Sequence, residues 1–454
     1  MTKLSRYNHF HRWRDGFHVA YNAGSGAVAL MTDENYATYR QVAEKMNGGT
    51  KVTWSEEEKT LLGQLKYGRF AYDDDYDELQ KLKFAHNVSR YNQSHMGMII
   101  APTMACNMAC QYCYEGNKTG RMSSDVIRDI IAAVQKQAPG ISKFQTNWYG
   151  GEPLLAFDII EELTSAFLEL GEKHEFGYVS TMISNGYLLT KEVADRLPDL
   201  RIRNVQITLD GPSRLHNQKR PLKNGRDSFR TIVENIHYAS SKVGIGVRVN
   251  IDRTYDAAIV EELLGELEEA DLRQRIGLYF GQVEPATKVC ANISETCYEG
   301  GDFSQVEVEY YRLLLKHGFY ISKLPTPLAT FCFCQSLNSF VVDPSGNLYR
   351  CLHYVGDESM SMGNVGSDPN YMHPNFTRLF DFDPFSEQSC TECNLLPVCL
   401  GGCPSRRMDR GITGVDQCES WKHNLCSMLE IIAASRQQQA QAQARSETGS
   451  PAKE

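Results

Sequence analysis

The sequence lacks the long apolar segments that a membrane protein or a secreted precursor needs. No window reaches the roughly 18 consecutive apolar residues of a membrane span, and the N-terminal stretch MTKLSRYNHFHRWRDGF contains no apolar core of a signal peptide. A basic excess is also missing, since the formal net charge is −9, which argues against a nucleic-acid-binding surface. These absences predict a cytoplasmic protein that binds neither membranes nor nucleic acids.

Cysteine, in contrast, is abundant. The chain has 454 residues and 14 cysteines, and without a secretion signal these residues are better interpreted as metal or cluster ligands than as disulfides. The length exceeds that of one ordinary domain of roughly 100–200 residues. We therefore expect two or three domains, some of which bind metal.

The first 92 residues predict a small α+β, winged-helix-like unit. Strand-like stretches at Phe17–Tyr21 and Ala27–Met31 flank the turn sequence AGSG, and a helix is expected from about Asp33. Thr53 or Ser55 can cap a second helix, because glutamates fill the first turn that follows. This unit is either a structural cap or a peptide-recognition module.

From about residue 95, apolar stretches alternate with helix-like segments. Strands are expected near residues 98–101, 144–149, 178–183, 205–209, 246–251 and 277–280, and helices near 124–136, 156–174, 191–197, 228–240 and 257–270. Such alternation predicts βαβ units around a parallel sheet, and six repeats favour a partial (β/α)6 TIM-like barrel over a closed eight-fold one. Active residues of these folds lie at the C-terminal ends of the strands.

The barrel is expected to occupy residues 93–300, and three further segments follow it. They are a bridging helical segment (residues 301–330), a cysteine-rich domain (residues 331–430) and a disordered tail (residues 431–454). The stretch NSFVVDPSGNLYRC predicts a hairpin with its turn at Pro344–Gly346. A last helix is expected near Glu419–Ser435, and the tail that follows lacks the large apolar residues of a packed segment.

Three cysteines lie close together in CNMACQYC, directly after the first strand of the alternation: Cys106, Cys110 and Cys113. A structural zinc site requires four closed ligands. A 4Fe–4S cluster held by only three cysteines instead keeps one iron open for an exogenous ligand. The residues alone leave zinc and iron as alternatives.

The CxxxCxxC spacing, with Tyr112 before the last cysteine, resembles the radical S-adenosylmethionine (SAM) superfamily. The resemblance implies that the three cysteines bind a 4Fe–4S cluster, that its open iron binds SAM, and that Tyr112 lies beside the adenine. It also implies that one-electron reduction cleaves SAM to a 5′-deoxyadenosyl radical, which abstracts hydrogen. The protein contributes positioning and exclusion of water to such chemistry.

Further motifs agree with this resemblance. The segment YGGEP matches a family motif that holds SAM, which implies cofactor-binding roles for Gly150, Gly151, Glu152 and Pro153. Proline also favours a helix start, so an ordinary turn is the alternative. Two later segments match family positions that reach SAM from neighbouring strands, which implies the same role for Ser184, Asn185, Arg248 and Asn250.

The stretch VQITLDGPSRLHNQKRP resembles a segment of peptide-modifying members of the family. This makes Asp210, at the expected end of the fourth strand, a candidate catalytic residue. Asp-Gly is also one of the strongest turn signals, so a structural role is the alternative.

The C-terminal cysteines resemble the SPASM domain, which extends some radical SAM enzymes and usually carries two auxiliary 4Fe–4S clusters. The spacing CxxCx5CxxxC and the upstream Gly346-x4-Cys351 carry this resemblance. It implies that auxiliary cluster I is bound by Cys351 and Cys403 with Cys332, Cys334 or both, and auxiliary cluster II by Cys390, Cys393, Cys399 and Cys418. Zinc ribbons use similar pairs, and Cys290, Cys297 and Cys426 fit no family position.

Family members with this extension mostly modify peptides or proteins. Sulfatase-maturating members carry an aspartate base directly after the position of Cys351, whereas this chain has Leu352 and His353 there. We therefore predict a peptide maturase that forms a thioether or carbon–carbon crosslink in a ribosomally made precursor peptide. Its electrons come from a donor such as flavodoxin or ferredoxin. The alternatives are a sulfatase-maturating-type or small-molecule dehydrogenase and, from another class, a zinc-binding scaffold without catalysis.

Overall fold

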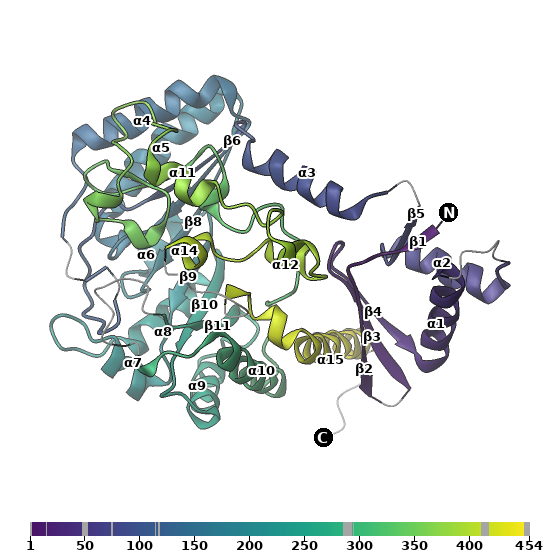
Figure 1. Cartoon of the computed structure of the whole chain (residues 1–454). Helices are drawn as coiled ribbons and strands as arrows, with labels where there is room; N and C mark the ends of the chain where they lie inside the picture. Colours follow the sequence, from purple (N-terminus) through teal and green to yellow (C-terminus); the bar gives the residue numbers. More distant parts are fainter. Residues whose placement is uncertain are drawn as a thin grey trace.

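The structure is a computed structural model that describes residues 2–14, 16–47, 53–73, 76–113, 115–116, 119–284, 293, 295–409 and 417–448. Figure 1 shows an α/β body, a smaller N-terminal unit beside it, and a C-terminal segment that packs on the body and ends in a long helix. Across these described ranges, no helix is both long enough and apolar enough to cross a membrane.

The body is built on six parallel strands that pair in chain order. They are β6 (His95–Ile100), β7 (Lys143–Trp148), β8 (Gly177–Ser184), β9 (Ile202–Thr208), β10 (Gly244–Ile251) and β11 (Ile276–Gln282). The helices between and after them are α4 (Ser124–Gln137), α5 (Phe157–His174), α6 (Lys191–Arg196), α7 (Ser213–Lys219), α8 (Phe229–Ala239), α9 (Ala257–Glu269) and α10 (Gly300–Lys316). Since β6 and β11 do not pair, the sheet stays open, and the predicted partial barrel is confirmed.

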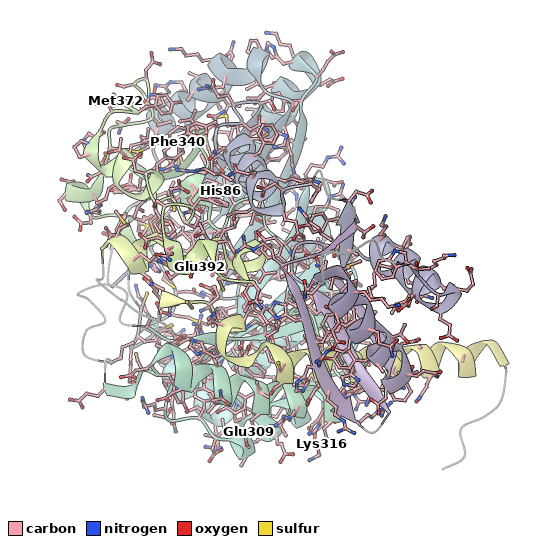
Figure 2. All side chains as sticks on the ribbon, turned by 45° about the vertical axis from the view of Figure 1, so that its right-hand side comes forward. His86, Glu309, Lys316, Phe340, Met372 and Glu392 are labelled. Atoms are coloured by element: carbon pink, nitrogen blue, oxygen red, sulfur yellow. The ribbon has the colours of Figure 1, made fainter. Side chains whose placement is uncertain are left out.

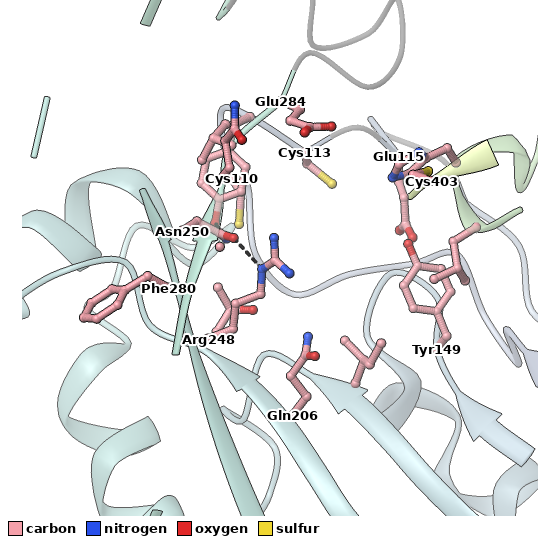
Figure 3. Close-up of a pocket in the computed structure, with 18 of the residues that line it drawn as sticks. Cys110, Cys113, Glu115, Tyr149, Gln206, Arg248, Asn250, Phe280, Glu284 and Cys403 are labelled. Atoms are coloured by element: carbon pink, nitrogen blue, oxygen red, sulfur yellow. Dashed lines mark hydrogen bonds between the residues drawn. The ribbon is translucent and has the colours of Figure 1, made fainter. Parts of the chain in front are cut away.

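Strand β10 shows how the sequence sorts the two faces of this sheet. Ile245, Val247, Val249 and Ile251 are buried, while the residues between them are less so. Successive side chains of a strand point to opposite faces, so the apolar set packs toward the helices. The alternate set, which includes Arg248 and Asn250, faces the interior of the barrel (Figure 3).

The predicted hairpin is confirmed, and it extends the barrel sheet. Strand β12 (Ser339–Val342) runs parallel to β6, and β13 (Leu348–Tyr349) pairs antiparallel with β12. Phe340 of β12, labelled in Figure 2, is buried in the core. The hairpin therefore anchors the cysteine-rich segment beside β6, the strand that leads into the first cysteine cluster.

The N-terminal unit contains a three-stranded meander of β2 (Asn8–Arg14), β3 (Phe17–Asn22) and β4 (Ala27–Thr32). Its other elements are β1 (Thr2–Leu4), β5 (Ala71–Asp73), α1 (Asp33–Asn47), α2 (Glu56–Tyr67) and α3 (Glu78–Arg90). Ser55, and not Thr53, caps α2, because its side chain and that of Glu58 exchange hydrogen bonds with each other's backbone. Predicted from sequence as α+β, the unit has that composition.

Helix α3 joins the N-terminal unit to the body and to the C-terminal segment (Figure 1). Its His86, labelled in Figure 2, is fully buried, and its Nδ1 lies 2.9 Å from the carbonyl oxygen of Ala329. Arg90, at the end of α3, donates to the carbonyl of Phe380. The N-terminal unit is thus tied to the rest of the molecule through buried polar contacts.

The C-terminal segment consists of short helices followed by one long helix. The short ones are α11 (Pro374–Phe380), α12 (Gln388–Thr391), α13 (Leu396–Cys399) and α14 (Pro404–Met408), and the long one is α15 (Trp421–Thr448). Residues 431–448 continue α15 where the sequence predicted a disordered tail, which corrects that prediction. The first residues of this stretch, Ile431, Ile432 and Ala433, pack in the core, and the alanines and glutamines that follow favour the helix. Residues 449–454 lie outside the described ranges.

Helix α15 also covers one face of the N-terminal sheet. Val19 and Tyr21 of β3 belong to the same apolar core as Met428 and Ile432 of α15, and His11 of β2 lies 2.6 Å from Glu430. The opposite face of the sheet packs on α1 and α2. The N-terminal sheet is therefore the middle layer between its own helices and α15.

Candidate cluster and cofactor site

The carboxyl ends of the barrel strands open into a cavity of about 710 Å³ (Figure 3). Its lining includes Cys106, Cys110 and Cys113 from the loop after β6 and, from the C-terminal segment, Cys403 and Cys418. Figure 3 shows Cys113 and Cys403 approaching this space from different parts of the chain. The predicted first cluster and part of the predicted auxiliary sites therefore share one cavity.

The loop after β7, which carries the GGEP motif, is hydrogen-bonded to the segment that leads from β6 to Cys106. The backbone N–H of Gly151 donates to the carbonyl of Thr103 at 3.2 Å, and that of Glu152 donates to the carbonyl of Ala105 at 2.9 Å. Gly150 has φ +126°, and a Cβ there would lie 2.2 Å from the Thr103 oxygen. Only glycine permits this approach, so the GGEP motif has a structural role in shaping the cysteine loop.

Glu152 is fully buried and binds protein groups. Its carboxylate accepts hydrogen bonds from the hydroxyl of Ser184 at 2.8 Å, the N–H of Asn185 at 2.7 Å and the N–H of Leu154 at 3.1 Å. Burial raises the pKa of Glu152, and these donors oppose the shift. Gly150 and Gly151 line the cavity whereas Glu152 does not. The described contacts make Glu152 a link between the loops after β7 and β8.

Asn185 connects the end of β8 to the cysteine loop. Its Nδ2 donates to Oδ1 of Asn107 at 2.7 Å and lies 3.8 Å from Sγ of Cys106. Ser184 and Asn185 both line the cavity. Three of the predicted cofactor-binding segments are therefore joined into one hydrogen-bonded structure around Cys106.

Tyr112 belongs to a buried polar network that the sequence did not predict. Its hydroxyl contacts Asp210 and accepts from Arg220 at 2.6 Å and from Nδ2 of Asn250 at 3.3 Å. Asp210 also forms a buried ion pair with Arg220 and accepts from the N–H of Asn250. The one sequence signal for Arg220 was its place in the stretch after Asp210.

The same network decides where Asp210 points. Asp210 is fully buried and is not part of the cavity lining, whereas Tyr112 and Arg220 are. Its backbone N–H donates to Nδ1 of the buried His216. The catalytic role expected for Asp210 stays a prediction, and its described contacts are those of a positioning residue.

Arg248 faces the cavity from β10. Its Nε donates to Oδ1 of Asn250 at 2.8 Å (Figure 3). The guanidinium lies across Gly281 of the neighbouring strand, where a Cβ would come within 2.5 Å of it. The missing side chain at Gly281 thus leaves room for the Arg248 guanidinium, which lines the cavity with its positive charge.

The C-terminal cysteines fall into two groups in space. Cys332 and Cys334 are hydrogen-bonded to each other, and electrostatic interactions connect this pair to Cys351 and Cys351 to Cys403. The second group unites the remaining four candidates, Cys390, Cys393, Cys399 and Cys418. These groups have the same members as the two auxiliary ligand sets expected from sequence, with both Cys332 and Cys334 in the first. Cys290 lies outside the described residues.

The chemistry of these donors fits iron–sulfur clusters. Burial raises the pKa of Cys110 to about 11 and also raises that of Cys106 and Cys113, so a bound cation is needed to keep these thiolates charged at neutral pH. In the described ranges, no three His, Cys, Asp or Glu side chains converge on a point for one metal ion. A 4Fe–4S cluster has a different requirement, because its irons are bound by separate thiolates.

Residues 100–252 match the family model described as the radical SAM superfamily. This part of the chain is a radical SAM domain. The matched range contains the three clustered cysteines, the GGEP motif, Asp210 and Arg248. The cysteines, the two glycines of the motif and Arg248 line the cavity, whereas Glu152 and Asp210 are fully buried and do not. Its cofactors are accordingly a 4Fe–4S cluster and SAM, and the roles of individual residues toward them stay predictions.

Two curated relatives are similar to about 70% of this chain. The cysteine-type anaerobic sulfatase-maturating enzyme of Clostridium perfringens is 24% identical and covers 72% of this chain and 94% of its own. The mycofactocin maturase MftC of Mycobacterium tuberculosis is 26% identical and covers 68% of this chain and 78% of its own.

Two solved structures share the fold. Native anSMEcpe with bound AdoMet and a Kp18Cys peptide matches with a TM-score of 0.59 at 21% identity and covers 76% of this chain and 99% of its own. Streptococcus suis SuiB bound to the precursor peptide SuiA matches with a TM-score of 0.50 at 14% identity and covers 89% of this chain and 95% of its own. The first neighbour thus leaves about a quarter of this chain unmatched, and the second only about a tenth.

Proposed function

We propose that this radical SAM enzyme is a peptide maturase that forms an intramolecular crosslink in a ribosomally made precursor peptide. The observation that carries the proposal is the N-terminal sheet, which stands beside the barrel with β4 at its edge. Ala29 and Leu30 of β4 are exposed, with Leu30 at 44%. An edge strand has unpaired backbone groups that bind an extended peptide by strand addition.

The N-terminal unit is also connected to the catalytic end of the molecule. Arg6 donates to the carbonyl of Thr391, and His9 contacts that of Asn394 at 3.3 Å. Thr391 ends α12 and Asn394 lies in the loop that follows, on either side of Cys393. A sheet that holds a peptide on β4 therefore contacts the cysteine-rich segment, which supports delivery of another part of the peptide to the cavity.

In the proposed site, Cys106, Cys110 and Cys113 hold the SAM-binding cluster, and Gly150, Gly151, Ser184, Asn185, Arg248 and Asn250 surround SAM. The cluster and SAM together supply the radical that takes hydrogen from a substrate carbon. Glu152 and the Tyr112–Asp210–Arg220 network keep the binding loops in register. Pro153 starts the turn after the motif, and the barrel wall excludes water.

The auxiliary sites complete the proposal. Cluster I is held by Cys332, Cys334, Cys351 and Cys403, and cluster II by Cys390, Cys393, Cys399 and Cys418. They accept the surplus electron that remains after crosslink formation. A reduced flavodoxin or ferredoxin supplies the electron that starts the reaction.

A sulfatase-maturating-type dehydrogenation is the second candidate, because the similarity to the Clostridium perfringens enzyme spans 72% of this chain. The residue after Cys351 lines the cavity, but it is Leu352, which has no acid–base chemistry. His353 also lines the cavity. The second candidate therefore lacks the carboxylate expected at that position, and crosslinking is favoured.

Anaerobic reconstitution with iron and sulfide tests the proposal in two stages. The loaded protein should cleave SAM to 5′-deoxyadenosine with dithionite as reductant, and zinc without iron would support the scaffold alternative. The peptides encoded by short open reading frames beside its gene are then added as substrates. If the product has lost two hydrogens and two of its fragments stay joined after proteolysis, crosslinking is supported. If the same mass loss is confined to one residue, dehydrogenation is supported.

A further inference from the structure

Arg350, the residue before Cys351, is a buried cation. Only 1% of it is exposed. Its guanidinium donates to three backbone carbonyls, those of Cys334, Ser339 and, at 2.8 Å, Ser336. No carboxylate of the described residues forms a hydrogen bond or an ion pair with this guanidinium.

Such a charge is costly unless it has a partner. Removing an ion from water without a counter-charge costs several kcal/mol. The three carbonyls and the ring of Phe376, 4.4 Å from the guanidinium carbon, offset part of this cost. An arginine side chain stays charged in proteins. A full positive charge thus lies in the interior without a paired carboxylate among the described residues.

The negative charge that would match it comes from the cysteines. The guanidinium donates to the carbonyl of Cys334, and Arg350 directly precedes Cys351 in the chain. These cysteines belong to the proposed ligand set of auxiliary cluster I. A 4Fe–4S cluster with four thiolates is an anion, and its negative charge increases when it takes up an electron.

We propose that Arg350 is the buried counter-ion of auxiliary cluster I and that it raises the reduction potential of that cluster. The inference rests on the proposed function and on its ligand set for cluster I. A fixed positive charge stabilises the reduced, more negative cluster over the oxidised one, and the low dielectric of the interior strengthens the effect. Through the carbonyls of Cys334 and Ser336, the same guanidinium fixes the loop that carries both ligands.

This arrangement suits a cluster that accepts an electron. Closing a bond between two substrate atoms removes two hydrogens: the first leaves as a hydrogen atom to the radical, and the second leaves as a proton, to the solvent, and one electron. An acceptor with a raised potential takes that electron more readily. Arg350 is therefore a positioning residue that acts on the reaction through cluster I.

The test uses the full chain with Cys106, Cys110 and Cys113 changed to Ala, so that the auxiliary clusters alone are titrated. In Arg350→Gln the ratio of reduced to oxidised cluster I at a fixed potential should fall about tenfold, which corresponds to about 59 mV for one electron. Arg350→Lys keeps the charge and should retain most of the potential. The readout is a redox titration followed by electron paramagnetic resonance.

Arg90 offers a matched control. It is also buried, at 4% exposure, donates to the carbonyl of Phe380 and lies 4.6 Å from that ring. Its contacts do not involve the cluster cysteines. Arg90→Gln should lower the stability of the protein and leave the potential of cluster I unchanged.

Two outcomes would overturn the inference. One is an unchanged potential in Arg350→Gln at full iron content, and the other is a potential that falls as far in Arg350→Lys as in Arg350→Gln. If Arg350→Gln does not load, the iron content of Arg350→Lys decides. A counter-ion predicts that Arg350→Lys still loads cluster I, whereas a clamp that needs all three carbonyl contacts predicts that it loads as poorly as Arg350→Gln. Iron content that survives Cys332→Ala with Cys351→Ala contradicts the ligand set itself.

Discussion

The carboxylate of Glu152 and the backbone N–H of Asn185 lie 2.7 Å apart and join the ends of two neighbouring barrel strands. The same carboxylate accepts from the Ser184 hydroxyl, and Asn185 reaches on to Asn107 in the cysteine loop. These hydrogen bonds connect the ends of β7 and β8 to the loop that carries Cys106, the first proposed cluster ligand. A change at Glu152 should therefore reach the cluster and its cofactor.

Glu152→Gln should loosen the cysteine loop. The glutamine amide has one oxygen and one NH2 group, so its NH2 would face at least one of the donors that now bind the carboxylate, the Ser184 hydroxyl or the N–H groups of Leu154 and Asn185. A buried donor without an acceptor costs about 1–3 kcal/mol. We expect about a tenfold or greater loss of SAM affinity, measured by calorimetry on the reconstituted protein. Ser184→Ala removes one donor only and should have a smaller effect; equal effects would contradict the linking role.

Gly150→Ala should prevent assembly of the site. Its Cβ would overlap the Thr103 oxygen at 2.2 Å, and its φ of +126° is disfavoured for alanine. We expect loss of at least about 2 kcal/mol in unfolding free energy and poor loading of the first cluster, measured by denaturation and iron content.

Gly140→Ala is the control for this change, because a Cβ at Gly140 would meet no atom within 4 Å. It should be nearly neutral in both measurements. A similar loss in the two variants would contradict the role given to the close approach of Gly150.

Asp210→Asn separates a catalytic from a positioning role. If Asp210 positions Tyr112 and Arg220, the variant should lose SAM binding and SAM cleavage together, because Arg220 then keeps a buried charge without its partner. Breaking such a pair costs about 3–5 kcal/mol. Normal SAM cleavage with loss of peptide modification would instead support the catalytic role, and the two activities are measured separately as 5′-deoxyadenosine and peptide product.

The exposed edge of the N-terminal sheet predicts where a peptide binds. Leu30→Asp should weaken binding of a precursor peptide at least tenfold without changing peptide-independent SAM cleavage, since the charge stands on the strand that would receive the peptide. Tyr67→Asp is the control, because Tyr67 is 94% exposed and belongs to α2 and not to the edge strand. Fluorescence anisotropy with labelled peptides from the neighbouring reading frames measures both; equal loss in the two variants would argue against strand addition.

The N-terminal unit should lose stability in acid through Glu58. The Lys45 ammonium, 2.6 Å away, and the Ser55 N–H lower the pKa of this buried carboxylate below its ordinary value of about 4.5. The folded state therefore binds the proton more weakly than the unfolded state. The stabilisation is present above the ordinary value and is lost as the pH falls through the lower folded value.

Urea unfolding between pH 3 and pH 6 measures this effect. Glu58→Gln should flatten the acid slope of the unfolding free energy, whereas Glu57→Gln, at an exposed position of the same helix turn, should keep it. An unchanged slope in Glu58→Gln would mean that other carboxylates govern acid stability.

How much of the fold could be predicted from sequence differs between the elements. The six barrel strands and their helices follow from periodicity, because each buries one face against a neighbour that is close in the chain. The tail that continues α15 was not predicted, since helix propensity alone gives no apolar pattern. Strand β2 was missed as well, because its alternation of His, Arg and aromatic residues resembles an exposed loop.

The sequence by itself determined the candidate ligands and the family resemblance, because cysteine spacing and the GGEP motif are local in the chain and reflect cluster chemistry. The tertiary structure alone decided what surrounds them: that β12 extends the barrel sheet beside β6, that Tyr112, Asp210 and Arg220 form one buried network, and that the buried Arg350 donates to the carbonyl of Cys334. These relationships depend on burial and on contacts between segments far apart in the chain, for which local pattern carries no signal.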